Sequence, residues 1–427
     1  MNKIKKLYCR TFQTAFKLAL PFLPYRKPKI AYSVKALPEI LKKKSCERVL
    51  IITDAGIKSL GLAKRLEQAL TANDIQFFMY DRTVANPTTA NVDEALALYH
   101  ENDCRAIIGF GGGSSMDCAK AVGARVAKPK QSLAKMKGIL KVHKKLPLLI
   151  AIPTTAGTGS ETTLAAVITD AETRHKYAIN DFPLIPRYAV LDPKVTLSLP
   201  PAITATTGMD ALTHAVEAYI GNSTTRGTRK NALLAVQLIF ENLDTAYRDG
   251  SNLEARRNML KASFYAGCAF TKSYVGYVHA VAHSLGGEYN VPHGLANAVL
   301  LPFVLEAYGS SIHKKLRRLA IEAGVAEKDT PCEEAAQNFI HAIQEMKEHF
   351  GIGNTISEIR EEDIPKLARY ADKEANPLYP VPVLMDAKEL EKFYHLLMKT
   401  EHGPETVSHT DTQAVPGTDV PERKENS

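Results

Sequence analysis

Short apolar runs alternate with helical patterns over the first half of the chain. Each run is continuous and apolar, as in strands that are buried inside a parallel sheet. The four runs lie at residues 48–53, 76–80, 105–110 and 146–152. Between them, residues 59–72 and 92–101 place apolar side chains at helical spacing. This alternation predicts a parallel sheet with crossover helices over residues 29–200.

The pattern changes near Pro200 and Pro201. From there to about Thr400, apolar positions recur at helical spacing almost throughout, which predicts an all-α domain over residues 201–400. Residues 401–427 are rich in Thr, Pro, Glu and Gly and hold few apolar residues, so we expect a disordered tail there. The sequence therefore predicts an α/β domain followed by a helical domain.

A basic amphipathic arm, residues 1–28, precedes the first domain. Its apolar residues recur at helical spacing, and its charged residues are all basic. The apolar positions are Ile4, Leu7, Tyr8, Phe12, Ala15, Phe16, Ala19, Phe22 and Leu23. The arm has no apolar run long enough to span a bilayer and no small-residue cleavage site. Two covers for its apolar side stay open: an anionic membrane surface, or the protein's own body or a partner subunit.

The net charge of +8 arises within the first 38 residues, which include the arm. Residues 1–38 hold nine Lys or Arg and no acid, which leaves 45 basic residues against 46 acidic residues elsewhere. The body is therefore close to neutral, and no nucleic-acid partner is indicated. A second basic stretch, residues 128–145, holds seven lysines and no acid. We interpret it as a solvated loop and helix face, with a phosphate-steering patch as the alternative.

The six cysteines are scattered along the chain and form no CxxC pair. This usage favours free thiols in a reducing compartment over a disulfide framework or a cysteine-based zinc site. We therefore expect a cytoplasmic protein, with peripheral membrane contact through residues 1–28 as the alternative that the arm leaves open.

Two pairs of polar residues repeat a spacing of four in the second half of the chain. They are Asp210 with His214 and His279 with His283, and His293 follows. Residues four apart lie on one face of a helix, one turn apart. A carboxylate with several imidazoles is a ligand set that a divalent transition metal accepts. The alternative is a pair of helix-surface contacts, and spacing alone would make His283 a ligand as the partner of His279.

Two loops that follow predicted strands have the composition of a phosphate-binding site. Gly111–Gly113 link one strand to a helix that we expect from about Cys118. Glycines let a ligand approach the backbone closely, and a helix N-terminus attracts an anion. The second loop, residues 153–161, offers hydroxyl groups to a sugar or diphosphate. Asp54 ends another strand, where it would bind ribose hydroxyls and repel a 2′-phosphate, or cap the next helix instead.

Four of these segments together resemble the group III, iron-containing alcohol dehydrogenases. They are Gly111–Asp117, Pro153–Glu161, Gly208–Tyr219 and His279–Pro302, and the resemblance runs from about Lys29 to Lys399. The family shares its fold with glycerol dehydrogenase and, more distantly, with dehydroquinate synthase. The resemblance implies an α/β N-terminal dinucleotide-binding domain and an all-α C-terminal metal-binding domain, the dehydroquinate synthase-like fold.

The resemblance also implies roles for individual residues. It makes Asp210, His214, His279 and His293 the metal ligands, and places His283 beside the substrate without being a fixed ligand. Phe270 matches an aromatic residue that lines the substrate pocket. The positions that match dinucleotide contacts are Asp54, Asn86, Gly112, Gly113, Ser114, Asp117, Thr154, Thr155, Thr158 and Lys176. Ala165 stands where some relatives carry an Asn near the nicotinamide, so one polar contact to the cofactor is in doubt.

The function that follows is a metal-dependent alcohol dehydrogenase or aldehyde reductase. It would move a hydride between a small alcohol and NAD, with NADP disfavoured by Asp54, and hold one Fe²⁺ or Zn²⁺ ion. A homodimer or larger oligomer is implied by the family. The alternatives are a dehydroquinate synthase-like lyase, a maleylacetate-type reductase and an inactive membrane-associated scaffold. Lys272 is the one obvious cation that a lyase could use for a phosphorylated acid.

Overall fold

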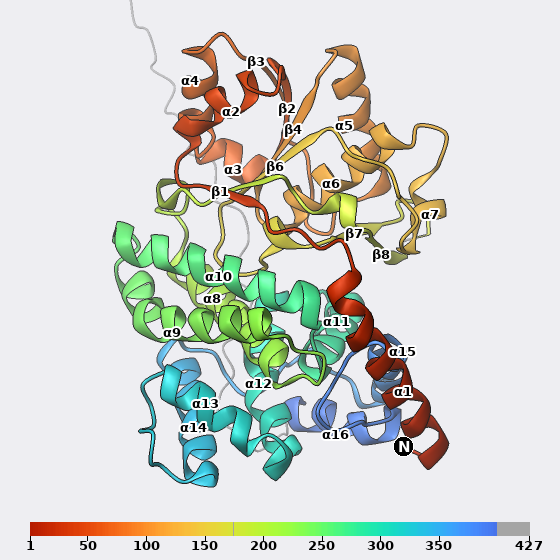
Figure 1. Cartoon of the computed structure of the whole chain (residues 1–427), viewed down its shortest axis with the longest axis vertical. Coiled ribbons are helices and arrows are strands. Elements are labelled where there is room, and N and C mark those ends of the chain that lie inside the picture. The colour runs from red at the N-terminus through yellow and green to blue at the C-terminus, as the bar shows by residue number, and fades with distance from the viewer. Residues whose placement is uncertain (174, 399–427) are drawn as a thin grey trace, which may run out of the picture.

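A six-stranded parallel sheet forms the centre of the first domain (Figure 1). The computed structural model describes residues 1–173 and 175–398, so the tail predicted at 401–427 lies outside the described residues. The strand order is β1-β9-β6-β4-β2-β3. The strands are β1 (Lys29–Ala31), β2 (Arg48–Ile52), β3 (Gln76–Tyr80), β4 (Ala106–Gly111), β6 (Leu148–Pro153) and β9 (Tyr188–Val190). All four predicted strands are present. The apolar runs of β2, β4 and β6 are buried between helices on both faces of the sheet, whereas β3 lies at the edge and buries only Tyr80.

The crossover helices differ from the prediction at two places. The helices are α2 (Leu37–Lys42), α3 (Ala55–Ser59), α4 (Lys64–Thr71), α5 (Thr89–Glu101) and α6 (Gly113–Ala127). The single helix predicted at 59–72 is wrong, because the chain turns at Gly61, whose φ of +66° ends α3 before α4 begins. The predicted start near Cys118 is also wrong, because α6 begins at Gly113 and the glycine turn supplies its first residues.

A second, three-stranded sheet was not predicted. It has the order β5-β8-β7 and contains β5 (Gly138–Ile139), β7 (Ala165–Thr169) and β8 (Lys176–Asn180). Together with the short helix α7 (Leu133–Met136), β5 lies within the lysine-rich stretch at 128–145. All seven lysines in that stretch are exposed or half-buried, so the interpretation of the stretch as solvated fits the structure.

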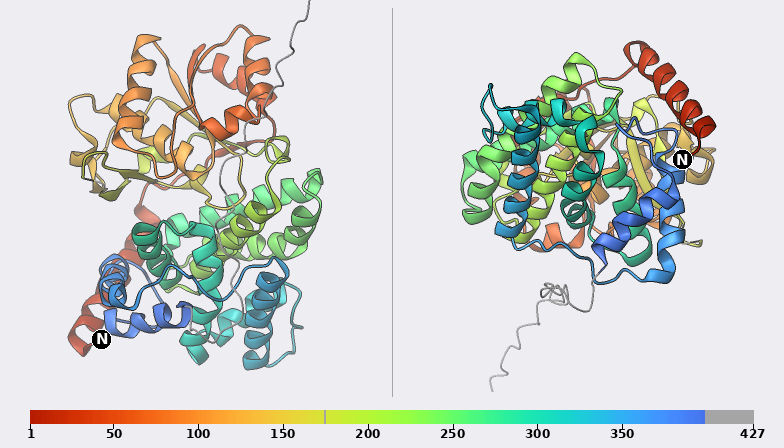
Figure 2. Two further views of the ribbon diagram at one scale, coloured as in Figure 1. Left: turned by 180° about the vertical axis from the view of Figure 1, so that it is seen from behind. Right: turned by 90° about the horizontal axis from the view of Figure 1, so that it is seen from below.

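The second domain consists of helices packed beneath the sheet domain (Figures 1 and 2). Its helices are α8 (Pro201–Ile220), α9 (Arg226–Arg248), α10 (Leu253–Ser273), α11 (Tyr277–Tyr289), α12 (His293–Tyr308), α13 (His313–Glu322), α14 (Cys332–His349), α15 (Ile364–Ala375) and α16 (Ala387–Leu397). Helix α8 is buried almost from end to end, because α9, α10 and α12 all pack on it. It is therefore the central helix of this domain.

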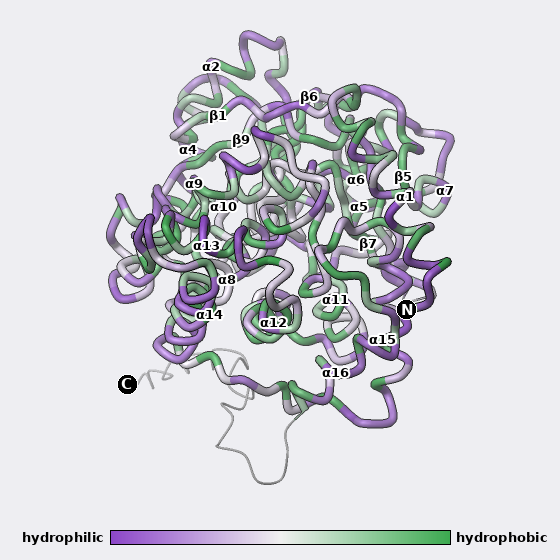
Figure 3. Tube along the Cα trace, turned by 60° about the horizontal axis from the view of Figure 1, so that its bottom comes forward, coloured by the Kyte–Doolittle hydropathy of each residue, from purple (hydrophilic) through white to green (hydrophobic). Residues whose placement is uncertain are grey.

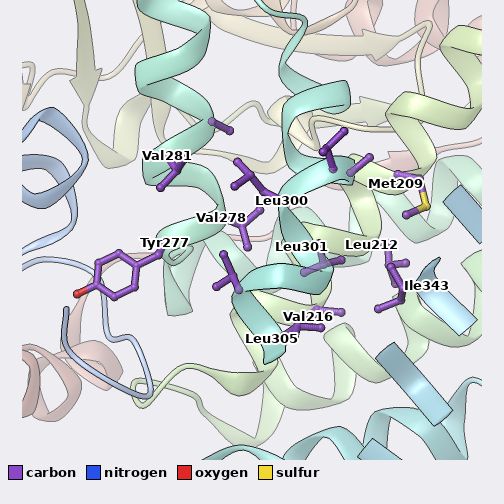
Figure 4. Close-up of a cluster of buried hydrophobic side chains, with 14 of the residues drawn as sticks. Met209, Leu212, Val216, Tyr277, Val278, Val281, Leu300, Leu301, Leu305 and Ile343 are labelled. Carbon is purple, nitrogen blue, oxygen red and sulfur yellow. The ribbon is translucent and has the colours of Figure 1, made fainter. Parts of the chain in front are cut away.

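Three central helices are locked together by one apolar cluster (Figure 4). Leu212 and Val216 come from α8, Val281 from α11, and Leu300 and Leu301 from α12. All five side chains are fully buried. Cores of this kind are close-packed and tolerate little displacement of their side chains. The polar residues that the same three helices carry are consequently held in fixed relative positions.

The arm forms helix α1 (Lys3–Ala19), as predicted, followed by a 3₁₀ turn, Leu20–Phe22. The helix lies along the outside of the helical domain, next to α15 and α16 (Figures 1 and 2). Lys5 pairs with Asp372 at 2.7 Å. Among the described residues, no helix is long and apolar enough to cross a bilayer.

Candidate metal and dinucleotide site

Four ligand-type side chains meet where α8, α11 and α12 come together. Asp210 and His214 lie on α8, His279 on α11, and His293 is the first residue of α12. One ligand atom from each residue lies within 4.8 Å of those of the other three. Asp210 Oδ1 is 3.8 Å from His214 Nδ1, 4.0 Å from His279 Nε2 and 3.5 Å from His293 Nε2. We call these four residues the ligand cluster.

The ligand cluster surrounds one point that attracts a positively charged or hydrogen-donating group. The Asn297 side-chain amide donates to Asp210 Oδ1 at 2.8 Å, and lies 3.2 Å from His279 Nε2 and 3.1 Å from His293 Nε2. A buried nitrogen of His214, Nδ1, has no hydrogen-bond partner in the part of the chain that the structure describes. A buried polar atom without a partner is costly unless another group completes the site. The donor set therefore fits a divalent cation.

Burial keeps the three histidines of the ligand cluster neutral. It lowers the pKa of His214, lowers that of His279 well below its ordinary value, and lowers that of His293 to about 4. The cause is the same for each ring, because burial penalises the charged imidazolium more than the neutral ring. A neutral imidazole keeps the lone pair that a metal needs.

A buried carboxylate orients His279. Glu217 Oε2 lies 2.6 Å from His279 Nδ1, and the same carboxylate accepts hydrogen bonds from the backbone N–H groups of Gly276 and Val278. Because Nδ1 is engaged by Glu217, Nε2 of His279 points to the ligand cluster. Carboxylates of this kind fix the tautomer and the ring orientation of metal-binding histidines.

His283 lies beside the ligand cluster but is not part of it. Its Nδ1 is 2.6 Å from Glu374 Oε1, and the Tyr379 hydroxyl donates to the same oxygen at 2.7 Å. Burial lowers the pKa of His283, but the facing Glu374 carboxylate outweighs this effect and the pKa is raised. The assignment of His283 as a ligand, from its spacing to His279 alone, is therefore wrong: the ring is turned to a carboxylate on α15.

Phe270 covers one side of the ligand cluster. Its ring stacks on His214, with 4.2 Å between ring centroids and 16° between ring planes. It projects from α10, a helix that carries none of the four ligand-type residues. An apolar ring at this position excludes water from the polar cluster, as expected for a pocket-lining residue.

The two predicted phosphate-binding loops lie side by side. They follow β4 and β6, which are neighbours in the sheet. A side chain on Gly113 would lie 3.4 Å from the Thr158 methyl group, and one on Gly112 would lie 3.8 Å from the Thr155 hydroxyl. Gly111, with φ +153°, supplies a turn that other residues rarely adopt. The carboxyl ends of parallel strands are where such folds bind nucleotides.

The remaining predicted cofactor residues approach these loops from neighbouring elements. Asp54 follows β2 and caps α3 through a 3.0 Å bond from Ile57 N–H, while Ser115 Oγ donates to its other oxygen at 3.3 Å. Asn86 accepts a hydrogen bond from Lys176 Nζ at 2.6 Å. The backbone N–H of Asn86 also donates to Ser114 Oγ at 3.3 Å. The structure thus brings three segments to the N-terminus of α6.

Asp117 and Thr154 differ from the other predicted contacts because they are mainly held inside the protein. Asp117 accepts from Ser160 Oγ at 2.9 Å and from Val167 N–H at 3.0 Å. Thr154 is buried, and its N–H donates to Gly111 O at 3.1 Å. Buried Lys120, which the sequence did not single out, donates to Ser160 Oγ at 2.8 Å. These bonds fasten the second loop to α6.

Two glycines bring the sheet domain against the helical domain. Gly159, in the second loop, has φ +58°, and a side chain on it would lie 2.8 Å from Gly267 Cα on α10. A side chain on Gly267 would in turn lie 2.9 Å from Gly159 O. Only backbone fits between the two, so the loop that is predicted to bind the dinucleotide reaches the helix that carries Phe270. The two halves of the site are therefore adjacent.

Comparison with known proteins identifies the family. A family model described as "Iron-containing alcohol dehydrogenase" matches residues 30–193, and one described as "Fe-containing alcohol dehydrogenase family, C-terminal" matches residues 204–398. Alcohol dehydrogenase 4 of Saccharomyces cerevisiae is 38% identical over 341 residues, which is 79% of this chain and 87% of the yeast protein. The chain belongs to the iron-containing alcohol dehydrogenase family.

Solved structures of family members have the same fold. A 1,3-propanediol oxidoreductase superposes with a TM-score of 0.83 at 34% identity, covering 87% of this chain and 97% of the other. A sulfoacetaldehyde reductase from Bifidobacterium kashiwanohense, solved in complex with NAD⁺, gives a TM-score of 0.77 at 29% identity and covers 87% and 98%. The fold class and the family resemblance predicted from the sequence are both confirmed.

Four residues of the family site escaped the sequence analysis. Asn297 is four residues after His293 and Glu217 is three after His214, so helical spacing could have found both. Lys120 is three residues after Asp117, with Nζ 3.6 Å from the Asp117 carboxylate, so the same spacing could have found it, whereas Glu374 has no comparable local pattern. Glu374 is 91 residues from His283 along the chain, and only the packing of α15 on α11 brings them together.

Proposed function

We propose that this family member is an NAD-linked, metal-dependent alcohol dehydrogenase that also reduces the corresponding aldehydes. Asp210, His214, His279 and His293 would hold one Fe²⁺ or Zn²⁺ ion. The single observation that carries the assignment is the convergence of one ligand atom from each residue within 4.8 Å. A divalent ion bound there supplies Lewis acidity to the substrate oxygen, which makes a bound alcohol easier to deprotonate.

The chain's own residues would position the substrate and move its proton. His283 stands next to the ligand cluster with Nδ1 held by Glu374, so its Nε2 is the atom free to exchange a proton with the substrate hydroxyl. Tyr379 and Glu374 continue this path away from the cluster. Phe270 would pack against the carbon that loses or gains the hydride and keep water away from it.

The dinucleotide would bind along the carboxyl ends of β2, β4 and β6. The Gly112–Ser114 turn offers backbone N–H groups to the diphosphate at the start of α6. Thr155 and Thr158 face this turn, and Asp54 is placed to accept bonds from ribose hydroxyls. The NAD⁺ complex of the related sulfoacetaldehyde reductase supports the choice of cofactor. An acid at the ribose disfavours the 2′-phosphate of NADP.

A small alcohol or aldehyde is the substrate class that the relatives support, since their names include alcohol dehydrogenase and 1,3-propanediol oxidoreductase. Lys272, the cation that a lyase would need, lies with Nζ 5.6 Å from the centre of the Tyr25 ring on the arm. This engagement disfavours the lyase alternative. The homodimer implied by the family stays a prediction, and so does the membrane contact of residues 1–28.

The deciding experiment combines metal analysis with a nicotinamide-absorbance assay on short-chain alcohols and aldehydes. We expect one divalent ion per chain and turnover with NAD. His293→Ala should lose both metal and turnover while it still binds NAD, because the cofactor residues lie in the other domain. The matched control is His341→Ala, an exposed histidine on α14 whose side chain is 70% exposed. A His293→Ala protein that keeps stoichiometric metal overturns the ligand assignment.

A further inference from the structure

Helix α1 turns its apolar side outward. Ile4 is 83% exposed, Leu7 70% and Leu18 69%, and Phe22 in the following turn is 87% exposed. Together with Tyr8 they form a line along one side of the helix, since their spacing follows helical periodicity. We call these five residues the apolar ridge. Figure 3 shows the helix at the edge of the molecule, with apolar and polar segments alternating along it.

The opposite side of α1 is held on the body by apolar packing and by polar contacts, since Cys9 is buried and Phe16 meets the Tyr274 ring with 5.2 Å between centroids. Arg10 donates to Val381 O and to Pro382 O, both at 2.7 Å. Gln13 is buried and donates to Tyr379 O at 2.7 Å. Lys5 pairs with Asp372. An amphipathic helix that merely covered its own domain would bury its apolar residues, so this orientation leaves the apolar ridge available to something else.

The charged residues of the arm itself have one sign, and the acids nearby, Asp372, Asp386 and Glu389, are paired with Lys5 or with the Met1 amino group. Lys3, Lys6 and Lys17 are exposed on α1, and no acidic residue occurs before Glu39. A ridge of aliphatic and aromatic side chains between lysines is the composition of helices that lie in the interface of an anionic bilayer. A second copy of this chain would bring the same lysines against these, and like charges repel.

A basic hollow continues this surface beyond the end of the arm. Arg26 of the arm, Lys144 and Lys145 of the lysine-rich stretch, and Arg187 all line it. The one acid there, Asp181, is occupied, because its carboxylate accepts hydrogen bonds from the N–H groups of Val142 and His143. The apolar residues Ile139 and Leu140 are exposed nearby, at 52% and 39%. The hollow thus combines several cations with an apolar edge.

We propose that the apolar ridge and the basic hollow together dock this protein on an anionic lipid bilayer. The helix would lie in the plane of the membrane, with Leu7, Leu18 and Phe22 among the acyl chains and Lys3, Lys6 and Lys17 at the headgroups. The hollow would take lipid phosphates. The binding is peripheral and reversible, because a single amphipathic helix with a basic rim gives reversible attachment that weakens with salt. Its face is distinct from the proposed metal and dinucleotide site.

The test is co-sedimentation of the full chain with vesicles of phosphatidylcholine, alone or mixed with phosphatidylserine, at low and at high salt. We expect binding to the mixed vesicles at low salt only. Leu7→Glu and Leu18→Glu should each weaken the partition coefficient by about tenfold or more, because a charge would enter the acyl region. The triple variant Lys3→Gln/Lys6→Gln/Lys17→Gln should lower the partition coefficient about a hundredfold, because each charge removed costs about a factor of five.

The matched control is Leu253→Glu, which adds the same charge at an exposed leucine at the start of α10, where an acid suits the helix dipole. Each variant is first checked for wild-type turnover, because none of these residues belongs to the proposed site. Two results overturn the proposal: equal binding by Leu7→Glu and Leu253→Glu, or equal binding to neutral and anionic vesicles. A concentration-dependent dimer that Leu7→Glu abolishes, without vesicle binding, also overturns it in favour of a second copy.

Discussion

Asp54 combines a structural contact with a position at the predicted ribose site. One of its oxygens caps α3 through Ile57 N–H, and the other accepts from Ser115 Oγ beside the glycine turn. Both alternatives that the sequence left open, a helix cap and a ribose contact, are compatible with this geometry. A substitution must therefore separate the cap from the charge.

Asp54→Asn makes that separation, because asparagine caps a helix about as well as aspartate but carries no charge. We expect the ratio of kcat/KM for NAD over NADP to fall by about tenfold, equal to about 1.4 kcal/mol, while the melting temperature stays close to wild type. Steady-state kinetics with both cofactors measures the ratio. If the wild-type enzyme already uses NADP at least as well as NAD, the role given to Asp54 is wrong.

The bond between His283 and Glu374 controls a proton at the proposed site. Burial lowers the pKa of His283, the Glu374 carboxylate raises it by more, and Glu374 itself has a lowered pKa because His283 faces it. The raised histidine pKa contributes stability below the ordinary value of 6.5, and this stability is lost as pH rises through the folded-state pKa. The lowered carboxyl pKa contributes stability above 4.5, which is lost as pH falls.

Glu374→Gln should move the His283 limb of the pH profile of kcat/KM to lower pH, because burial and the Lys176 charge then outweigh the weaker opposite effect of Asp210 on the ring. The stability lost in the variant should be largest between about pH 4.5 and 6.5 and should shrink at higher pH. The control is Glu288→Gln, a carboxylate on α11 that pairs with Lys366 at the surface. An unchanged pH profile in Glu374→Gln would remove His283 from the proton path.

At the level of elements, the contact between the second loop and α10 positions the two halves of the site. The contact depends on Gly159 and Gly267, because their lack of side chains lets the backbone of the loop touch the backbone of α10. Neither glycine is replaceable without separating the loop from the helix. The loop also carries Thr155 and Thr158, so a displacement here changes the distance between the dinucleotide and the ligand cluster.

Gly267→Ala should lower the free energy of unfolding by about 1–3 kcal/mol, the usual cost of overpacking, and raise the KM for NAD. Thermal melts and NAD titrations measure these effects. Gly287→Ala on α11 is the control, because a side chain there meets nothing within 4 Å and the helix should gain up to ~1 kcal/mol. Similar melting temperatures for the two variants would show that the glycine contact is unimportant.

The elements also show what the sequence could predict. The strand at 76–80 was predicted to the residue, because its short run of aromatic and apolar residues favours a strand and polar residues precede and follow it. The break between α3 and α4 was missed, since it depends on the backbone conformation at Gly61. Glu374 was missed because it joins the site only through tertiary packing. The ligand cluster was thus predicted from the family resemblance, since local spacing alone would have added His283, and most of the groups that surround the cluster were missed.

At the scale of the whole molecule, a bound metal would join three helices that are far apart in the sequence. We expect a chelator to lower the melting temperature, since a ligand present at about 100 times its dissociation constant stabilises the folded state by about 2.7 kcal/mol. Differential scanning calorimetry of His293→Ala should show no chelator effect. A chelator that shifts wild type and variant equally acts somewhere other than the ligand cluster.

The orientation of α1 on the body could not be predicted from the sequence either. Its amphipathic pattern predicted the helix, but periodicity cannot say which face turns inward. The contacts that decide it, from Arg10 to Val381 and from Gln13 to Tyr379, join residues 371 and 366 positions apart. They depend on where the chain returns after α15. Only the folded arrangement therefore reveals that the side of the helix with Cys9, Arg10 and Gln13 is the attached side.

That same separation sets an order of events at the ribosome. Helix α1 is synthesised before its polar docking partners at residues 372–382, which are made more than 360 residues later. At about 5–20 residues per second, the nascent arm waits roughly 20–70 seconds for them. Throughout that interval its basic, apolar helix can meet a membrane or a chaperone before any other part of the protein attaches it. The arm is thus translated long before the segment that completes its attachment to the fold.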